Sequence, residues 1–109
     1  MLNCLLICAA MAQLTPVARD TFAREAFAVI GHMQACDDNH VKIRSVTARV
    51  NKRIFNGADE AETLQYLAMA QSATKRARER QQAGETGLSC EEARRRFAAL
   101  DASLVAAEP

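Results

Sequence analysis

Apolar residues recur at helical spacing in four stretches of the chain, and no useful length alternates with the period of two expected for a strand. Each stretch places its apolar side chains on one face, and in the third stretch Leu64 and Leu67 lie beside a stripe of small residues. The four sets are Phe22, Ala26, Val29, Ile30, Met33 and Cys36; Ile43, Val46, Val50 and Ile54; Leu64, Leu67, Ala70, Ala73 and Ala77; and Ala93, Phe97, Leu100 and Leu104. This pattern predicts an all-α protein.

Capping signals precede each of these stretches and give the helices their limits. Asn56-Gly57 is a stop for the second helix, the third runs to about Gln82, and Gly84 and Gly87 mark the loop that follows it. The start signals are Thr15 before Pro16, Asn39, Asp59 with Glu62 three residues later, and Ser89 with Glu92. Because short loops join antiparallel neighbours, the sequence predicts a four-helix up-down bundle.

Composition agrees with a single small helical domain. The chain has 109 residues, of which 50% are hydrophobic, but it contains no Trp and only four Gly and two Pro. So few glycines and prolines disfavour a turn-rich β-sandwich or a disordered linker. Fourteen Lys and Arg against thirteen Asp and Glu give a net charge of +1, so no bulk field attracts nucleic acid or a membrane.

Residues 1–12 carry no charged side chain and are interpreted as a signal peptide. An apolar run covers 5–12, and Ala10-Met11-Ala12 fits a signal-peptidase site, which leaves 13–109 as one helical domain. The segment is short and lacks basic residues, so we interpret the recorded start as lying inside a longer signal. It is too short to span a bilayer. The expected location is periplasmic or secreted; in the alternative, residues 1–12 lengthen the first helix of a cytosolic protein.

Removal of residues 1–12 leaves two cysteines, Cys36 and Cys90. An even count in a small exported chain indicates a disulfide. In an up-down bundle the end of the first helix and the start of the fourth lie at the same pole, where these two cysteines fall. The sequence therefore predicts a disulfide between Cys36 and Cys90, worth about 4 kcal/mol in the chain-entropy model.

A metal site is the alternative use of these cysteines. Zinc accepts two thiolates and two imidazoles, and His32, Cys36 and His40 are spaced four residues apart, with Cys90 as the fourth ligand. Residues 37–39, Asp-Asp-Asn, should end the helix and carry His40 away, and the spacing matches no zinc-finger pattern. We therefore expect no metal and no cofactor.

The densest basic runs flank the loop before the fourth helix. They comprise Lys75, Arg76, Arg78, Arg80, Arg94, Arg95 and Arg96. One interpretation is a patch for an anionic polymer or an acidic envelope protein. The other is a solvated face, since basic residues complement the end of the third helix and nearby glutamates neutralise the charge.

Two further classes of function find less support. The helix predicted over 40–56 has a basic flank, formed by Lys42, Arg49, Lys52 and Arg53, that could follow a phosphate backbone. That helix has a single aromatic residue for base stacking, Phe55, and the whole chain is near neutral rather than strongly basic, so no nucleic-acid partner is expected. Nucleophile-elbow, metalloprotease, C-x-x-C and phosphate-loop motifs are also absent, and the protein is not expected to be an enzyme.

The layout resembles small exported helical proteins of unknown function. The matching features are Cys36, the basic run 75–78 and the segment 87–91, Gly-Leu-Ser-Cys-Glu; no activity comes with this resemblance. The layout alone is also similar to periplasmic acid-stress chaperones of the HdeA type. We therefore expect a non-catalytic, disulfide-stapled binding or structural protein of the cell envelope. The alternatives are an acid- or stress-responsive chaperone, which would bind ANS reversibly between pH 7 and 2, and a cytosolic metal- or nucleic-acid-binding protein.

Overall fold

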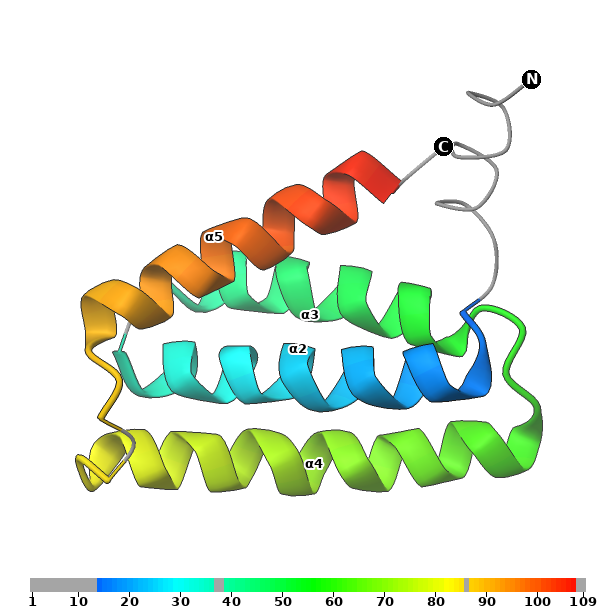
Figure 1. Cartoon of the computed structure of the whole chain (residues 1–109), viewed down its shortest axis with the longest axis horizontal. Helices are drawn as coiled ribbons and strands as arrows, with labels where there is room; N and C mark the ends of the chain where they lie inside the picture. Colours follow the sequence, from blue (N-terminus) through cyan, green and yellow to red (C-terminus); the bar gives the residue numbers. More distant parts are fainter. Residues whose placement is uncertain (1–13, 37–38, 86, 108–109) are drawn as a thin grey trace.

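The computed structural model describes residues 14–36, 39–85 and 87–107, and in these ranges it contains four helices and no strand. The helices are α2 (Pro16–Cys36), α3 (His40–Phe55), α4 (Glu60–Gln82) and α5 (Cys90–Ala107), which run alternately up and down (Figure 1). The predicted all-α, four-helix up-down fold is confirmed. The segment interpreted as a signal peptide, 1–12, and the break at residues 37 and 38 lie outside the described residues.

Side chains cap the helices at the predicted positions. A full capping box begins α4. The backbone amide of Glu62 donates a hydrogen bond to the Asp59 side chain, and the backbone amide of Asp59 donates one to the Glu62 side chain. The other three caps are Thr15 Oγ1 to the amide of Ala18 at 3.2 Å, Asn39 Oδ1 to the amide of Lys42 at 3.1 Å, and Ser89 Oγ to the amide of Glu92 at 3.1 Å. Gly57 follows α3 with a φ of 77°, which a residue without Cβ adopts at little cost.

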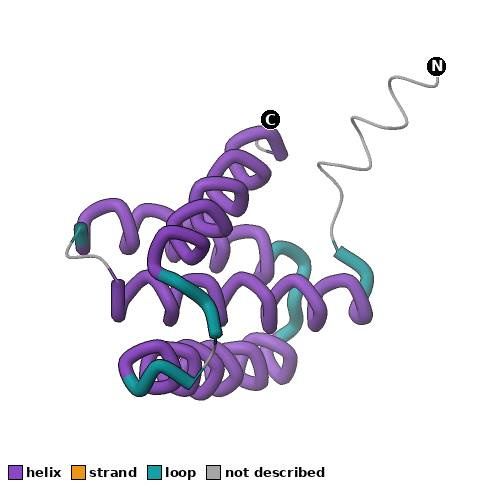
Figure 2. Tube along the Cα trace, turned by 60° about the vertical axis from the view of Figure 1, so that its left-hand side comes forward, coloured by secondary structure: helices purple, strands orange, loops and turns teal. Residues whose placement is uncertain are grey.

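Helix α2 is the centre of the molecule. It packs against all three other helices, most extensively against α4, and it separates α4 on one side from α3 and α5 on the other (Figures 1 and 2). Among the four described helices, α4 packs almost only against α2. The bundle therefore lacks a square cross-section, and α4 leaves an open flank towards α3 and another towards α5.

Small residues bring α2 and α4 close together. A Cβ added to Gly31 would clash with the carbonyl oxygen of Thr74 and would lie 2.8 Å from Cβ of Ala77. Both Gly31 and Ala77 are buried at this crossing. The stripe of small residues on α4 therefore serves as the contact surface for the central helix.

The core lies around α2, and the predicted apolar face of α3 is confirmed. Its four members, Ile43, Val46, Val50 and Ile54, are all buried, together with Phe27 and Tyr66. Helix α4 differs from its sequence pattern, because Leu64 and Leu67 are 63% and 45% exposed. The reason is that, among the described helices, α4 packs mainly against α2, so these helices cover only a narrow face of it.

A disulfide between Cys36 and Cys90 joins the end of α2 to the start of α5, as predicted. The two Cα atoms are 5.4 Å apart and 54 positions apart in the sequence. Arg94 reinforces this pole by donating a hydrogen bond of 3.1 Å to the carbonyl of Cys36. The last carbonyls of a helix have no partner within the helix, so a basic side chain is favourable there.

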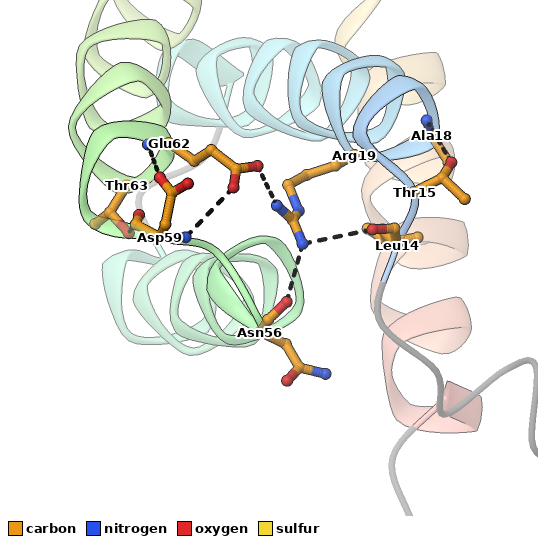
Figure 3. A network of polar contacts seen from close by, with 8 residues as sticks. All are labelled: Leu14, Thr15, Ala18, Arg19, Asn56, Asp59, Glu62 and Thr63. Carbon is orange, nitrogen blue, oxygen red and sulfur yellow. Dashed lines mark hydrogen bonds and ion pairs between the residues drawn. The ribbon is translucent and has the colours of Figure 1, made fainter.

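A buried arginine joins three segments at the opposite pole (Figure 3). Arg19 is 4% exposed, and its Nη1 lies 2.6 Å from Oε2 of Glu62. Its Nη2 donates to the carbonyls of Asn56 at 3.1 Å and Leu14 at 3.4 Å. The start of α2, the end of α3 and the first turn of α4 are therefore held by one side chain.

Candidate functional site

The structure distributes the seven predicted basic residues over several surfaces. Arg76, Arg80 and Arg96 line one cleft between α2, α4 and α5. Lys75 and Arg78 line a groove on the other flank of α4, where Arg78 also donates to Gln34 at 3.0 Å. Arg94 contacts the end of α2, and Arg95 pairs within its own helix with Glu91 and Glu92.

The cleft of Arg76, Arg80 and Arg96, called the arginine cleft below, has a volume of about 510 Å³. It forms because α4 and α5 both pack on α2 but hardly touch each other. Five basic residues line it: Arg24, His32, Arg76, Arg80 and Arg96. Four apolar side chains line it as well: Ala28, Ala73, Ala77 and Leu88. The described lining residues include no carboxylate.

Two of the four arginines of the cleft are neutralised by partners on their own helix. Arg24 Nε lies 2.9 Å from the carboxylate of Asp20, and that hydrogen bond is the main reason why the pKa of Arg24 is raised above its usual value. Arg96 Nε lies 3.5 Å from Glu92. Neither Arg76 nor Arg80 forms an ion pair with a residue in the described part of the chain, so these two supply the excess positive charge.

His32 connects the cleft to the loop before α5 through Gln81. The Gln81 amide nitrogen donates to the carbonyl of Leu88 at 2.8 Å, which leaves the amide oxygen to accept from His32 Nδ1 at 2.9 Å. Nδ1 of His32 is therefore the donor in this contact, and Nε2 is the second polar atom of the ring. This bridge ties α2 to the loop whose residues Gly87 and Leu88 form one wall of the cleft.

The four residues of the alternative zinc set are not brought together as ligands. Both sulfur atoms form the disulfide, and His32 is bonded to Gln81. His40 begins α3 and lines a separate groove with Arg44 and Arg78. Within the described ranges no three His, Cys, Asp or Glu side chains group as metal ligands.

Part of the basic flank of α3 is used inside the fold. Asp101 of α5 accepts from Lys42 at 3.0 Å and from Arg49 at 2.6 Å. The hydrogen bond from Lys42 is the largest cause of a lowered Asp101 pKa; burial opposes it, and Arg49 adds to the lowering. The side chains of Lys42 and Arg49 therefore join α3 to α5 through Asp101, and they do not form a continuous basic surface for a phosphate backbone.

Sequence reasoning found three arginines of the cleft but not their neighbours. Arg24 lies on the first predicted helix and His32 entered only as a metal ligand, and both join the cleft because α2 is central. Arg19 was also missed, because its partners come from positions 14, 56 and 62. The one signal available in the sequence was that Arg19, a basic residue, lies on the apolar face of an amphipathic helix, which indicates a buried charge with a partner.

No family model, curated protein or solved structure matches this chain. Among the four described helices, none has the length and apolar character needed to cross a membrane. The disulfide is compatible with a protein outside the cytosol. The geometry of the arginine cleft is therefore the basis for any functional inference.

Proposed function

We propose that the protein is a non-catalytic binding module of the cell envelope, periplasmic or secreted, that binds an anionic partner in the arginine cleft. The observation that carries this proposal is the pair Arg76 and Arg80. They lie four residues apart on one face of α4 and have no ion-pair partner among the described residues. Guanidinium groups at that spacing can converge on one phosphate or carboxylate and donate two hydrogen bonds each.

The surroundings of this pair support binding rather than a solvated face. Arg24 comes from α2 and Arg96 from α5, so three helices direct basic side chains towards the same cleft. Arg76 and Arg80 also differ from Lys75 on the same helix, which pairs with Glu79 at 3.8 Å, as basic residues of a solvated face do.

Export is the second part of the proposal. It is supported by the disulfide between Cys36 and Cys90, a bond that persists in oxidising compartments and is rare in the cytosol. The apolar, uncharged segment 1–12 supports it as well. Fractionation of cells that express the chain with residues 1–12 present or deleted tests this part, and a chain that stays in the cytosol with free thiols at Cys36 and Cys90 would contradict it.

The binding part is tested with long-chain polyphosphate as the anionic probe, measured by calorimetry at low and physiological salt. We expect the double variant Arg76→Gln, Arg80→Gln to lose most of the affinity. The matched control is the double variant Lys75→Gln, Arg95→Gln. It removes the same amount of charge outside the cleft and should retain the affinity for polyphosphate. Equal losses in both variants would show a general charge effect and overturn the proposal.

A further inference from the structure

The arginine cleft combines charge with an apolar floor. Ala28 of α2, Ala73 and Ala77 of α4, and Leu88 of the following loop line it below the arginines. Ala73 and Leu88 also pack against the hydrophobic core, so the floor is continuous with the interior. A site for a simple inorganic anion would need only the basic side chains and would gain nothing from this floor.

The size of the cleft points in the same direction. A volume of about 510 Å³ is far more than a single phosphate group fills, and it falls in the range of sites for small organic ligands. Such sites combine apolar walls with a few polar groups that fix orientation. The arginine side chains lie at the rim of the cleft, because Arg76, Arg80 and Arg96 are exposed. Ala77 on the floor is buried.

We infer that the ligand is an amphiphilic anion, a phosphate or carboxylate head attached to an aliphatic body. The head pairs with Arg76 and Arg80, and the body covers Ala28, Ala73 and Leu88. This inference rests on the proposed function and names the chemical class of its anionic partner. Small alanine side chains suit this role, because they let an alkyl chain lie close to the helix backbones.

The network at His32 supports a preformed site. Gln81 holds both the ring of His32 and the carbonyl of Leu88, so the wall formed by the loop is fixed to α2 before any ligand binds. The disulfide fixes the same loop at Cys90, two residues further on. A preformed wall lowers the ordering cost of binding.

The test compares three probes on the oxidised full chain, each below its micelle concentration: octyl phosphate, inorganic phosphate and octyl glucoside. Octyl phosphate should bind at least about tenfold more tightly than inorganic phosphate, a gain that burial of two methylene groups supplies. Octyl glucoside, which has the chain without the charge, should show no saturable binding. Chemical shifts of the Leu88 methyl groups report whether the chain reaches the floor.

Two variants separate the head from the body. Ala73→Gln places a polar side chain on the floor and should weaken octyl phosphate while it leaves inorganic phosphate unchanged. Arg76→Gln with Arg80→Gln should abolish binding of both, whereas Lys75→Gln with Arg95→Gln should abolish neither. Circular dichroism of each variant checks that the helices remain folded.

The outcomes distinguish this inference from the proposed function. If octyl phosphate and inorganic phosphate bind with equal affinity while polyphosphate binding is retained, the inference of an amphiphilic ligand is overturned. The proposal of an anion-binding module then still holds. Binding of octyl glucoside as tight as that of octyl phosphate would also overturn it, because the arginines would then contribute nothing. Failure of octyl phosphate, inorganic phosphate and polyphosphate alike would overturn both proposals.

Discussion

The guanidinium of Arg19 and the carboxylate of Glu62 meet at 2.6 Å across 43 residues of sequence, with the Arg19 side chain 5% and the Glu62 side chain 32% exposed. Glu62 also completes the capping box of α4. One carboxylate thus fixes the start of α4 and compensates a buried positive charge on α2. This ion pair holds one pole of the bundle, and the disulfide holds the other.

Replacement of Glu62 by Gln should destabilise the fold, because it removes the charge opposite Arg19. Gln still serves at this position of a capping box, so the helix start is preserved. We expect the free energy of unfolding to fall by about 1.5 to 3 kcal/mol, the range for hydrogen bonds to charged groups. Urea denaturation at pH 7 measures it.

Glu60→Gln is the matched control for this prediction. Glu60 lies in the same first turn of α4 and is exposed, so its replacement removes the same favourable interaction with the helix dipole without touching Arg19. Equal losses for the Glu60 and Glu62 variants would show that the contact with Arg19 contributes no stability.

Removal of the disulfide should have the largest effect of the changes considered. Closing a loop of 54 positions contributes about 4 kcal/mol in the chain-entropy model. The double variant Cys36→Ala, Cys90→Ala should lose about that amount, and reduction of the native chain should reproduce the loss. An unchanged denaturation midpoint in the double variant would show that non-covalent packing alone holds this pole.

The sequence predicted the helices and their connections well, because the signals for them are local. Thr15, Asn39, Asp59 and Ser89 cap the amides of residues three positions later, and such pairs can be read within one turn. The disulfide followed from the same helix limits, since an antiparallel arrangement brings the two cysteines to one pole.

The packing and the cleft could not be predicted, because they depend on which helix is central. The alanine-rich pattern of α4 marks several faces as equally suitable for burial, so Tyr66 could not be distinguished from Leu64 and Leu67. Only the structure shows that α4, among the described helices, packs mainly against α2 and that this packing leaves the flank where the arginine cleft forms. The burial of Arg19 depends on that same arrangement.

Asp101 should make stability depend on pH in the acid range. Its folded pKa is lowered from 3.8, first by the hydrogen bond from Lys42 and then by Arg49, so the charged form is favoured in the native state. That contribution is fully present above the unfolded pKa and is lost as pH falls through the lower folded pKa. The variant Asp101→Asn should therefore be less stable than the native chain at pH 6, by about 1 kcal/mol.

The difference between these two proteins should shrink as pH falls below about 4, and denaturation curves taken from pH 6 to 2 measure it. Asp20→Asn provides the comparison, because Asp20 pairs with an exposed Arg24 on its own helix. It should show little difference at any pH. A gap for Asp101→Asn that stays constant down to pH 2 would contradict the assigned ion pairs.

Gly31 sets the distance between α2 and α4. In an exposed helix, replacement of Gly by Ala adds about 1 kcal/mol of stability through helix propensity. At Gly31 the new Cβ would meet the carbonyl of Thr74 and lie 2.8 Å from Cβ of Ala77, so the two helices must separate. We expect Gly31→Ala to lower the free energy of unfolding by about 1 to 3 kcal/mol, the usual cost of overpacking.

The double variant Gly31→Ala, Ala77→Gly tests the cause of this loss, because it removes one of the two clashing partners. It should recover part of the stability relative to Gly31→Ala, even though glycine at position 77 is the poorer helix former. Since Ala77 also lines the arginine cleft, separation of α2 and α4 in Gly31→Ala should weaken octyl phosphate binding as well. A stability gain from Gly31→Ala would show that the two helices are not in close contact at this crossing.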